Sequence, residues 1–157
     1  MQLSNIFLPC VDQGGYRKFK FKIGELYHLG SDRNASQYTS VYNLIEGVCV
    51  WSDETPGFGS FGGKGGVVII ESEFENKKYS ILYGHLTREV KKGDYIKKNY
   101  EIGKLIKYET KEYRADHLHW GVWDGGGLPP FNWGYSKEIK NWIDPDIFLK
   151  NYLNKTF

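Results

Sequence analysis

Along most of the chain, short hydrophobic stretches are separated by short polar ones, a pattern that predicts strands rather than helices. Residues 67–71 form an apolar run with polar ends, a pattern typical of a strand covered on both faces. Residues 78–82 resume the strand pattern and bring His85 to a strand end. Residues 41–51 have the composition of a β-strand, which is interrupted at Gly47 by a tight turn or a bulge. Most of the chain is therefore expected to be β-structure.

One helix is expected, close to the C-terminus. Residues 144–150 begin with Asp144, a favourable N-cap, and continue with Pro145 at the first helical position. We expect about two to three turns. Residues 90–98 and 102–106 predict short strands around a Gly-Asp turn. The predicted fold class is all-β, an antiparallel sheet with one short C-terminal helix.

Size and charge exclude several classes of protein. A chain of 157 residues predicts one domain, and its 40% hydrophobic and 25% charged content is ordinary for a globular protein. No apolar run reaches the length of a membrane span, and the N-terminal segment shows no convincing secretory signal. The net charge of +2 comes without a long basic patch, so we expect no nucleic-acid partner. We expect a monomer.

Cysteines, aromatic residues and glycines leave several points open. Cys10 and Cys49 are too few for a disulfide framework and match no zinc pattern; free buried thiols are favoured over a pair. The aromatic content of 17% fits either a β-rich core or a groove for sugars or peptides. Residues 56–66 contain six glycines and predict a mobile loop, either lining a groove or serving as a connector.

The histidines are the candidate chemistry. His117 and His119 are two apart in a predicted strand, so they share a face with Cα atoms about 7 Å apart. A single pair of this kind is more often an ordinary polar pair. However, the chain has only four histidines, and the other two, His28 and His85, also lie in segments that look like parts of a site.

His28 and Asp32 are four residues apart, but Gly30 and the serine after it argue against a helix. An extended segment would hold the two about 13 Å apart, whereas ligands of one zinc ion lie within about 4 Å of each other. A shared metal therefore requires a bend, which Gly30 permits; the alternative is an ordinary surface turn. Four imidazoles and one carboxylate fit a hydrolytic zinc site, with three ligands, an open position and nearby bases.

These motifs together resemble the lysostaphin-type zinc metallopeptidases, often called the LytM family. The resemblance depends on His-x-Gly-x-Asp at 28–32, Tyr-Gly-His-Leu at 83–86 and His-x-His at 117–119. Further matching stretches follow in the family's order, at 46–50, 66–70, 90–96, 102–103 and 144–149. The resemblance covers about residues 24–150. It implies an antiparallel β-sandwich with a groove (the duplicated hybrid motif, a barrel-sandwich hybrid), in one metallopeptidase domain over 1–157.

The resemblance also implies roles that the residues alone leave open. His28, Asp32 and His119 match the three Zn²⁺ ligands, while His85 and His117 match two uncoordinated catalytic histidines. The implied function is a zinc-dependent endopeptidase that hydrolyses peptide bonds of bacterial peptidoglycan, in the cross-bridge or the stem peptide, through metal-activated water. The family implies an extracellular or cell-envelope location, which the sequence itself does not reveal.

Three features depart from the family or match it loosely. The Gly/Ser/Thr-rich loop that usually precedes the His-x-His motif is replaced by residues 109–116, so the cleaved bond stays open. An aromatic insertion at 124–142 is expected to reshape one wall of the cleft. Tyr16 is a candidate for a tyrosine that some relatives place near the metal.

Three other functions compete with the hydrolase. The first is a non-catalytic, zinc-stabilised interaction domain of the same fold, although such domains usually lack a ligand and none is missing here. The second is a biotinyl- or lipoyl-carrier-like hairpin at 90–105, which would need a lysine beside a methionine, whereas the sole methionine is Met1. The third is a zinc hydrolase acting on another bond.

Overall fold

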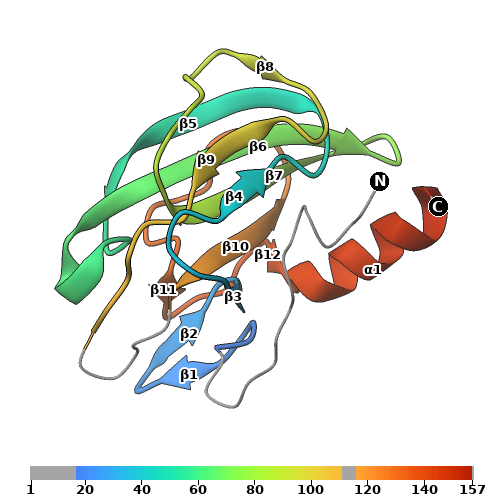
Figure 1. Ribbon diagram of the computed structural model, residues 1–157. Helices are drawn as coiled ribbons and strands as arrows, with labels where there is room; N and C mark the ends of the chain where they lie inside the picture. The colour runs from blue at the N-terminus through green and yellow to red at the C-terminus, as the bar shows by residue number, and fades with distance from the viewer. Residues whose placement is uncertain (1–16, 111–115, 157) are drawn as a thin grey trace.

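The computed structural model describes residues 17–110 and 116–156 and is built mainly of antiparallel β-sheet (Figure 1). The elements in chain order are β1 Lys22–Ile23, β2 Leu26–His28, β3 Ser31–Asn34, β4 Ser40–Tyr42, β5 Gly47–Pro56, a 3-10 turn η2 Ser60–Gly62, β6 Lys64–Phe74, β7 Lys77–Leu86, β8 Tyr95–Ile96, β9 Glu101–Lys104, β10 His117–Asp124, β11 Tyr135–Ser136, β12 Trp142–Ile143 and α1 Pro145–Thr156. The predicted fold class is confirmed.

The largest sheet has the strand order β12-β10-β7-β6-β5-β8, and β3 also pairs with β10. A three-stranded sheet, β1-β2-β11, and the pair β4-β9 lie beside it. Two strands of the main sheet therefore carry three of the four histidines: β10 carries two, and the end of β7, its neighbour, carries one. The fourth histidine ends β2.

The hydrophobic core lies on both faces of the main sheet. Val68 and Ile70 of β6 belong to a cluster that includes α1 and the β4-β9 pair. Val67 and Ile69 belong to a second cluster, together with tryptophans of the insertion. All four side chains are fully buried, which confirms the prediction of a strand covered on both faces.

The C-terminal helix begins as predicted but is longer. The side chain of Asp144 accepts a hydrogen bond from the backbone N–H of Asp146 at 2.9 Å, as an N-cap does. The helix then continues to Thr156 rather than ending near residue 150. Tyr152 explains the extension, because it is buried and its ring packs 5.3 Å from that of Phe74. Packing against the core adds a turn that local signals do not predict.

Two predicted breaks in the β-structure lie elsewhere. Gly47 begins β5 rather than interrupting a strand, and a bulge follows at Cys49–Trp51. A Cβ at Gly47 would lie 2.1 Å from the carbonyl oxygen of Glu71, so this glycine permits close strand pairing. The Gly-Asp turn precedes β8 rather than joining two paired strands: β8 pairs with β5, and β9 pairs with β4.

The glycine-rich loop is shorter than predicted, because β5 and β6 extend into it from both sides. The remaining residues 57–63 form a hairpin in which the N–H groups of Gly57 and Gly59 both donate to the carbonyl of Gly63, at 3.1 and 3.0 Å. The hairpin carries Phe58, which is buried. It is therefore part of the core as well as a connection.

Cys49 is a buried free thiol that donates to the carbonyl of Trp51 at 3.2 Å. Burial raises the pKa of the Cys49 thiol to about 11. The other cysteine, Cys10, lies outside the described residues.

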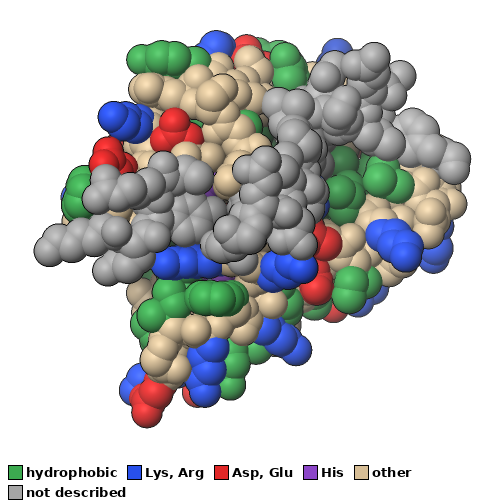
Figure 2. Space-filling view, turned by 60° about the horizontal axis from the view of Figure 1, so that its bottom comes forward, with side chains coloured by type: hydrophobic (Ala, Val, Ile, Leu, Met, Phe, Trp, Pro, Cys, Tyr) green, Lys and Arg blue, Asp and Glu red, His purple; other side chains and the backbone are tan. Residues whose placement is uncertain are grey.

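On the face shown in Figure 2, Lys and Arg side chains are interspersed with acidic and hydrophobic ones. Among residues 17–110 and 116–156, no helix has both the length and the apolar character that crossing a bilayer requires.

Candidate metal centre

A sharp bend between β2 and β3 brings His28 and Asp32 together. The bend lies at Gly30, and it places His28 Nε2 3.2 Å from Asp32 Oδ1. A Cβ on Gly30 would lie 2.4 Å from the carbonyl oxygen of Trp120 and 2.8 Å from His119 Nε2. The predicted bend is confirmed, and the glycine has a second role, because any larger residue would push the third side chain of the cluster away.

The pairing of β3 with β10 supplies that third side chain. His119 lies opposite Asp32 in the strand register, and its Nδ1 is 3.1 Å from His28 Nε2 and 3.3 Å from Asp32 Oδ1. We call these three atoms the donor triangle. Ligands of a tetrahedral zinc ion, each about 2.0–2.1 Å from the metal, lie about 3.3–3.4 Å apart. The donor triangle therefore has the size of one face of such a tetrahedron.

Hydrogen bonding and charge prepare these groups for a cation. His28 Nδ1 lies 3.1 Å from the carbonyl of Lys18; an N–H donated there leaves the Nε2 lone pair directed into the triangle. Burial alone would raise the pKa of Asp32, but the charges of His117 and His28, with hydrogen bonds from His119 and His28, hold that pKa well below its usual range. The carboxyl is therefore an anion. Two imidazole nitrogens and a carboxylate oxygen are ligands that zinc accepts.

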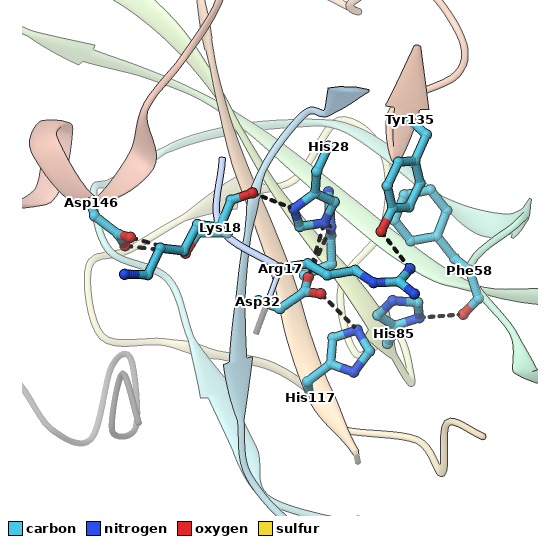
Figure 3. A network of polar contacts seen from close by, with 11 residues as sticks. Arg17, Lys18, His28, Asp32, Phe58, His85, His117, Tyr135 and Asp146 are labelled. Carbon is cyan, nitrogen blue, oxygen red and sulfur yellow. Dashed lines mark hydrogen bonds and ion pairs between the residues drawn. The ribbon is translucent and has the colours of Figure 1, made fainter. Parts of the chain in front are cut away.

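The other two histidines lie against each other beside the triangle. The rings of His85 and His117 are 4.5 Å apart, and Tyr108 packs on both, at 4.4 and 4.7 Å. His117 Nε2 is 3.7 Å from Asp32 Oδ2, the carboxylate oxygen outside the triangle. His119 thus contributes to the triangle, while His117 lies beside the Asp32 carboxylate (Figure 3). The geometry therefore brings His119, and not His117, into the group of three donor atoms.

His85 is held in an unusual conformation. Its φ of 69° is in the left-handed region that non-glycine residues rarely adopt. Its Nδ1 lies 2.7 Å from the carbonyl of Phe58, so an N–H there leaves Nε2 as the acceptor. Burial, reinforced by the charges of His117 and His119, lowers the pKa of His85 well below its usual value. The ring is therefore neutral at pH 7 and able to accept a proton.

The donor triangle and the two further histidines line a cavity, and six other residues that line it were not singled out from the sequence: Arg17, Gly57, Phe58, Tyr108, Gly134 and Tyr135. The Arg17 guanidinium donates to the Tyr135 hydroxyl at 2.6 Å, and burial raises the pKa of the Tyr135 phenol, which stays protonated. Phe58 lies in the glycine-rich loop and Tyr135 in the aromatic insertion, the segments expected to border the cleft, but no pattern in the sequence points to any of these residues individually. The predicted candidate Tyr16 lies outside the described residues.

The space between these groups is small. The cavity that the five predicted residues and the six additional ones line measures about 30 Å³, room for an ion or a water molecule and little else. Residues 111–115 of the loop expected to border the cleft lie outside the described residues, whereas Tyr108 at its start packs on the two histidines.

Comparison with protein families shows which proteins are built in this way. The model of peptidase family M23 matches residues 26–130. The chain belongs to peptidase family M23. None of the curated proteins matches it significantly.

Solved structures of other peptidases share the fold of this M23 chain. The catalytic domain of lysostaphin, an antimicrobial peptidase from Staphylococcus simulans, is 24% identical over 88% of this chain and 90% of its own, with a TM-score of 0.62. The chain covers 49% of whole lysostaphin. A zinc-containing peptidase from Vibrio cholerae is 26% identical over 70% of this chain and 34% of its own, with a TM-score of 0.51. A variant catalytic domain of the prophage-encoded M23 protein EnpA from Enterococcus faecalis is 20% identical over 85% and 87%, with a TM-score of 0.56.

Proposed function

We propose that this M23 peptidase is a zinc-dependent endopeptidase that hydrolyses peptide bonds of bacterial peptidoglycan, in the cross-bridge or the stem peptide. His28, Asp32 and His119 hold the zinc ion, and His85 and His117 are the acid-base residues. The observation that carries the proposal is the donor triangle, of zinc-ligand size, with two further imidazoles next to it. The zinc-containing peptidase among the structural neighbours supports the choice of metal.

The residues fit the metal in number, type and charge. The Asp32 carboxylate offsets part of the charge of a divalent ion, and a three-residue shell leaves one coordination position for water. Zinc bound there would act as a Lewis acid and lower the pKa of a bound water towards 7. Asp32 is held by its strand register and His28 by the Lys18 carbonyl, so the ligands are pre-arranged before any ion arrives.

The uncoordinated histidines handle protons. His85 is neutral at pH 7, and its Nδ1 contact to Phe58 leaves Nε2 as the atom that accepts a proton from the attacking water. His117 packs against the His85 ring and lines the cavity around the donor triangle. Between them, the two rings take up the proton of the water and return one to the departing amine.

The Arg17–Tyr135 pair supplies hydrogen-bond donors to the same cavity. A carbonyl under attack develops negative charge on oxygen, and fixed donors in a site that excludes water stabilise that charge. The guanidinium stays charged at every pH used for assay, and the raised pKa of Tyr135 keeps its hydroxyl a donor. We assign these two residues to binding the substrate carbonyl or its developing oxyanion.

The direct test is turnover of purified peptidoglycan. The zinc-loaded protein should release new amino groups, a chelator should abolish the release, and added zinc should restore it. Mass spectrometry of the fragments then identifies the bond, which separates cross-bridge from stem-peptide cleavage. Zinc binding without any release would instead indicate the non-catalytic, zinc-stabilised domain. Release that a chelator does not affect would contradict the metal mechanism.

A further inference from the structure

A second, larger cavity adjoins the metal centre. It measures about 300 Å³ and lies between the end of β5, the glycine-rich hairpin and the aromatic insertion. It shares Gly57, Phe58, Gly134 and Tyr135 with the cavity around the donor triangle. The ring of Phe58 connects the two, since it packs 5.3 Å from His85 and 5.5 Å from His119. A chain lying in the larger cavity thus continues directly to the reacting groups.

The walls of this aromatic cavity are rigid. Trp133 is buried, and its indole N–H donates to the carbonyl of Pro129 at 3.1 Å. Phe131 stacks on Trp133, with ring centroids 4.9 Å apart and an interplanar angle of 20°. Trp51 meets both rings edge-on, at 5.7 and 5.2 Å. A fixed aromatic surface of this kind binds a ligand with little loss of its own conformational freedom.

One ring of this wall is displayed rather than buried. Phe131 is 62% exposed although it rests on a fully packed tryptophan. Asn132, between the two stacked residues, has a φ of 72°, a conformation tolerated by asparagine and uncommon in other non-glycine residues. Backbone strain concentrates at ligand sites. Here it accompanies an aromatic ring that is held in place and left open to solvent.

The cavity also lacks charge. Its lining within the described part of the chain consists of aromatic rings, small residues and the neutral polar groups of Thr55 and Asn132, with no ionised side chain. Burying an ionised side chain there would remove its water and offer no opposite charge. An uncharged residue instead gains by covering apolar surface. The electrostatics of the cavity therefore discriminate against charged ligands.

We propose that the aromatic cavity is a substrate subsite that binds a short uncharged stretch of peptide, and that it excludes lysine-like and glutamate-like side chains there. The inference rests on the proposed peptidase function and adds a selectivity to it. The substrate residues beside the cleaved bond on this side are small or apolar. Any charged residue of the substrate lies outside this cavity.

Binding of short peptides tests the subsite without requiring turnover. The probes are blocked tetraalanine, tetralysine and tetraglutamate, and the readout is the indole N–H resonances of Trp133 and Trp51 in nitrogen-15-labelled protein. Tetraalanine should shift both resonances saturably, and the charged peptides should bind at least about fivefold more weakly, as unpaired charges in an apolar site do.

Two variants and a matched control sharpen the result. Phe131→Ala should weaken tetraalanine binding several-fold, because it removes one stacked wall. Ile147→Ala, which truncates a 60% exposed side chain on α1, should leave binding unchanged. Asn132→Asp keeps the size and the tolerance of positive φ and adds a negative charge, so it should favour tetralysine by up to about fivefold.

The outcomes that overturn the subsite differ from those that overturn the peptidase. Equal binding of all three peptides, no shift with any of them, shifts only with an N-acetylglucosamine disaccharide, or an unaffected Phe131→Ala variant would each contradict it. None of these depends on zinc or on hydrolysis. Failure of the peptidoglycan assay alone would overturn the proposed function and leave the peptide selectivity of the cavity measurable.

Discussion

The metal centre and the aromatic cavity are neighbours built by different means. The donors of the metal centre come from β2, β3 and β10, and all of them are nearly inaccessible to solvent. The aromatic cavity is bounded by a hairpin and an irregular insertion, and its outer ring is mostly exposed. Strand pairing fixes atoms to the tolerance that metal chemistry requires, while loops are free to vary what is bound. Changes at Phe131 or Asn132, which line the aromatic cavity but not the metal centre, should therefore leave the metal centre intact.

The largest effect is expected from removing a zinc ligand. Asp32→Asn replaces an anionic donor by a neutral amide, so the protein should no longer retain zinc, and turnover should fall to that of chelator-treated wild type. Zinc content by atomic emission checks this. Asp124→Asn, the same change at a partly exposed position paired with Lys77, is the control and should keep both metal and activity. Retention of zinc by Asp32→Asn would remove this carboxylate from the site.

Loss of an uncoordinated histidine should separate chemistry from metal binding. His117→Ala and His85→Ala should each lower turnover by about 10²-fold to 10⁴-fold, the usual effect of losing a general base. Both variants should still hold zinc and should bind tetraalanine as the wild type does. If His117→Ala lost its metal, the roles of the His-x-His pair would have to be exchanged.

A smaller effect is expected from pH. Burial is the main reason that the pKa values of His85 and His119 lie below the usual 6.5. Below pH 6.5 the unfolded chain therefore binds protons that the folded chain does not, until pH reaches the lowered pKa values. Within that window the free energy of unfolding of the metal-free protein should decrease as pH decreases, by about 1.4 kcal/mol per pH unit for each histidine.

Urea unfolding of the metal-free protein between pH 8 and pH 5 measures this slope, which should be shallower in His85→Ala.

Asp32 affects the stability of the metal-free protein over a different, more acidic pH range. Its lowered pKa means that its stabilising effect is complete above about pH 4 and disappears only as pH falls further. Zinc affinity should also decrease as pH falls through about 6, because the ligand imidazoles must be neutral. A flat zinc affinity from pH 8 to pH 5 would contradict a histidine-based site.

Several features of the fold and the site followed from the sequence because they depend on local geometry. The bend at Gly30 followed from the reach of an extended chain, and the two-sided burial of β6 followed from its apolar run. The end of α1 and the role of Gly47 did not, because both are decided by contacts with distant residues, Phe74 and Glu71.

The residues that complete the cavity were beyond prediction for the same reason. Phe58 reaches the histidines only because Gly84 leaves room: a Cβ there would lie 2.6 Å from the Phe58 ring. Tyr108 and Tyr135 lie in segments without periodicity, so no pattern indicates which way they face. Arg17 is placed by its contact with Tyr135. Each depends on packing between distant segments of the chain.

Anomalous diffraction at the zinc absorption edge, from crystals of the zinc-loaded protein, tests the central claim most directly. We predict a single strong peak about 2.0–2.2 Å from His28 Nε2, Asp32 Oδ1 and His119 Nδ1, with neither His85 nor His117 among the ligands. Absence of a peak at these three atoms, or a peak bound by His117 in place of His119, would contradict the account.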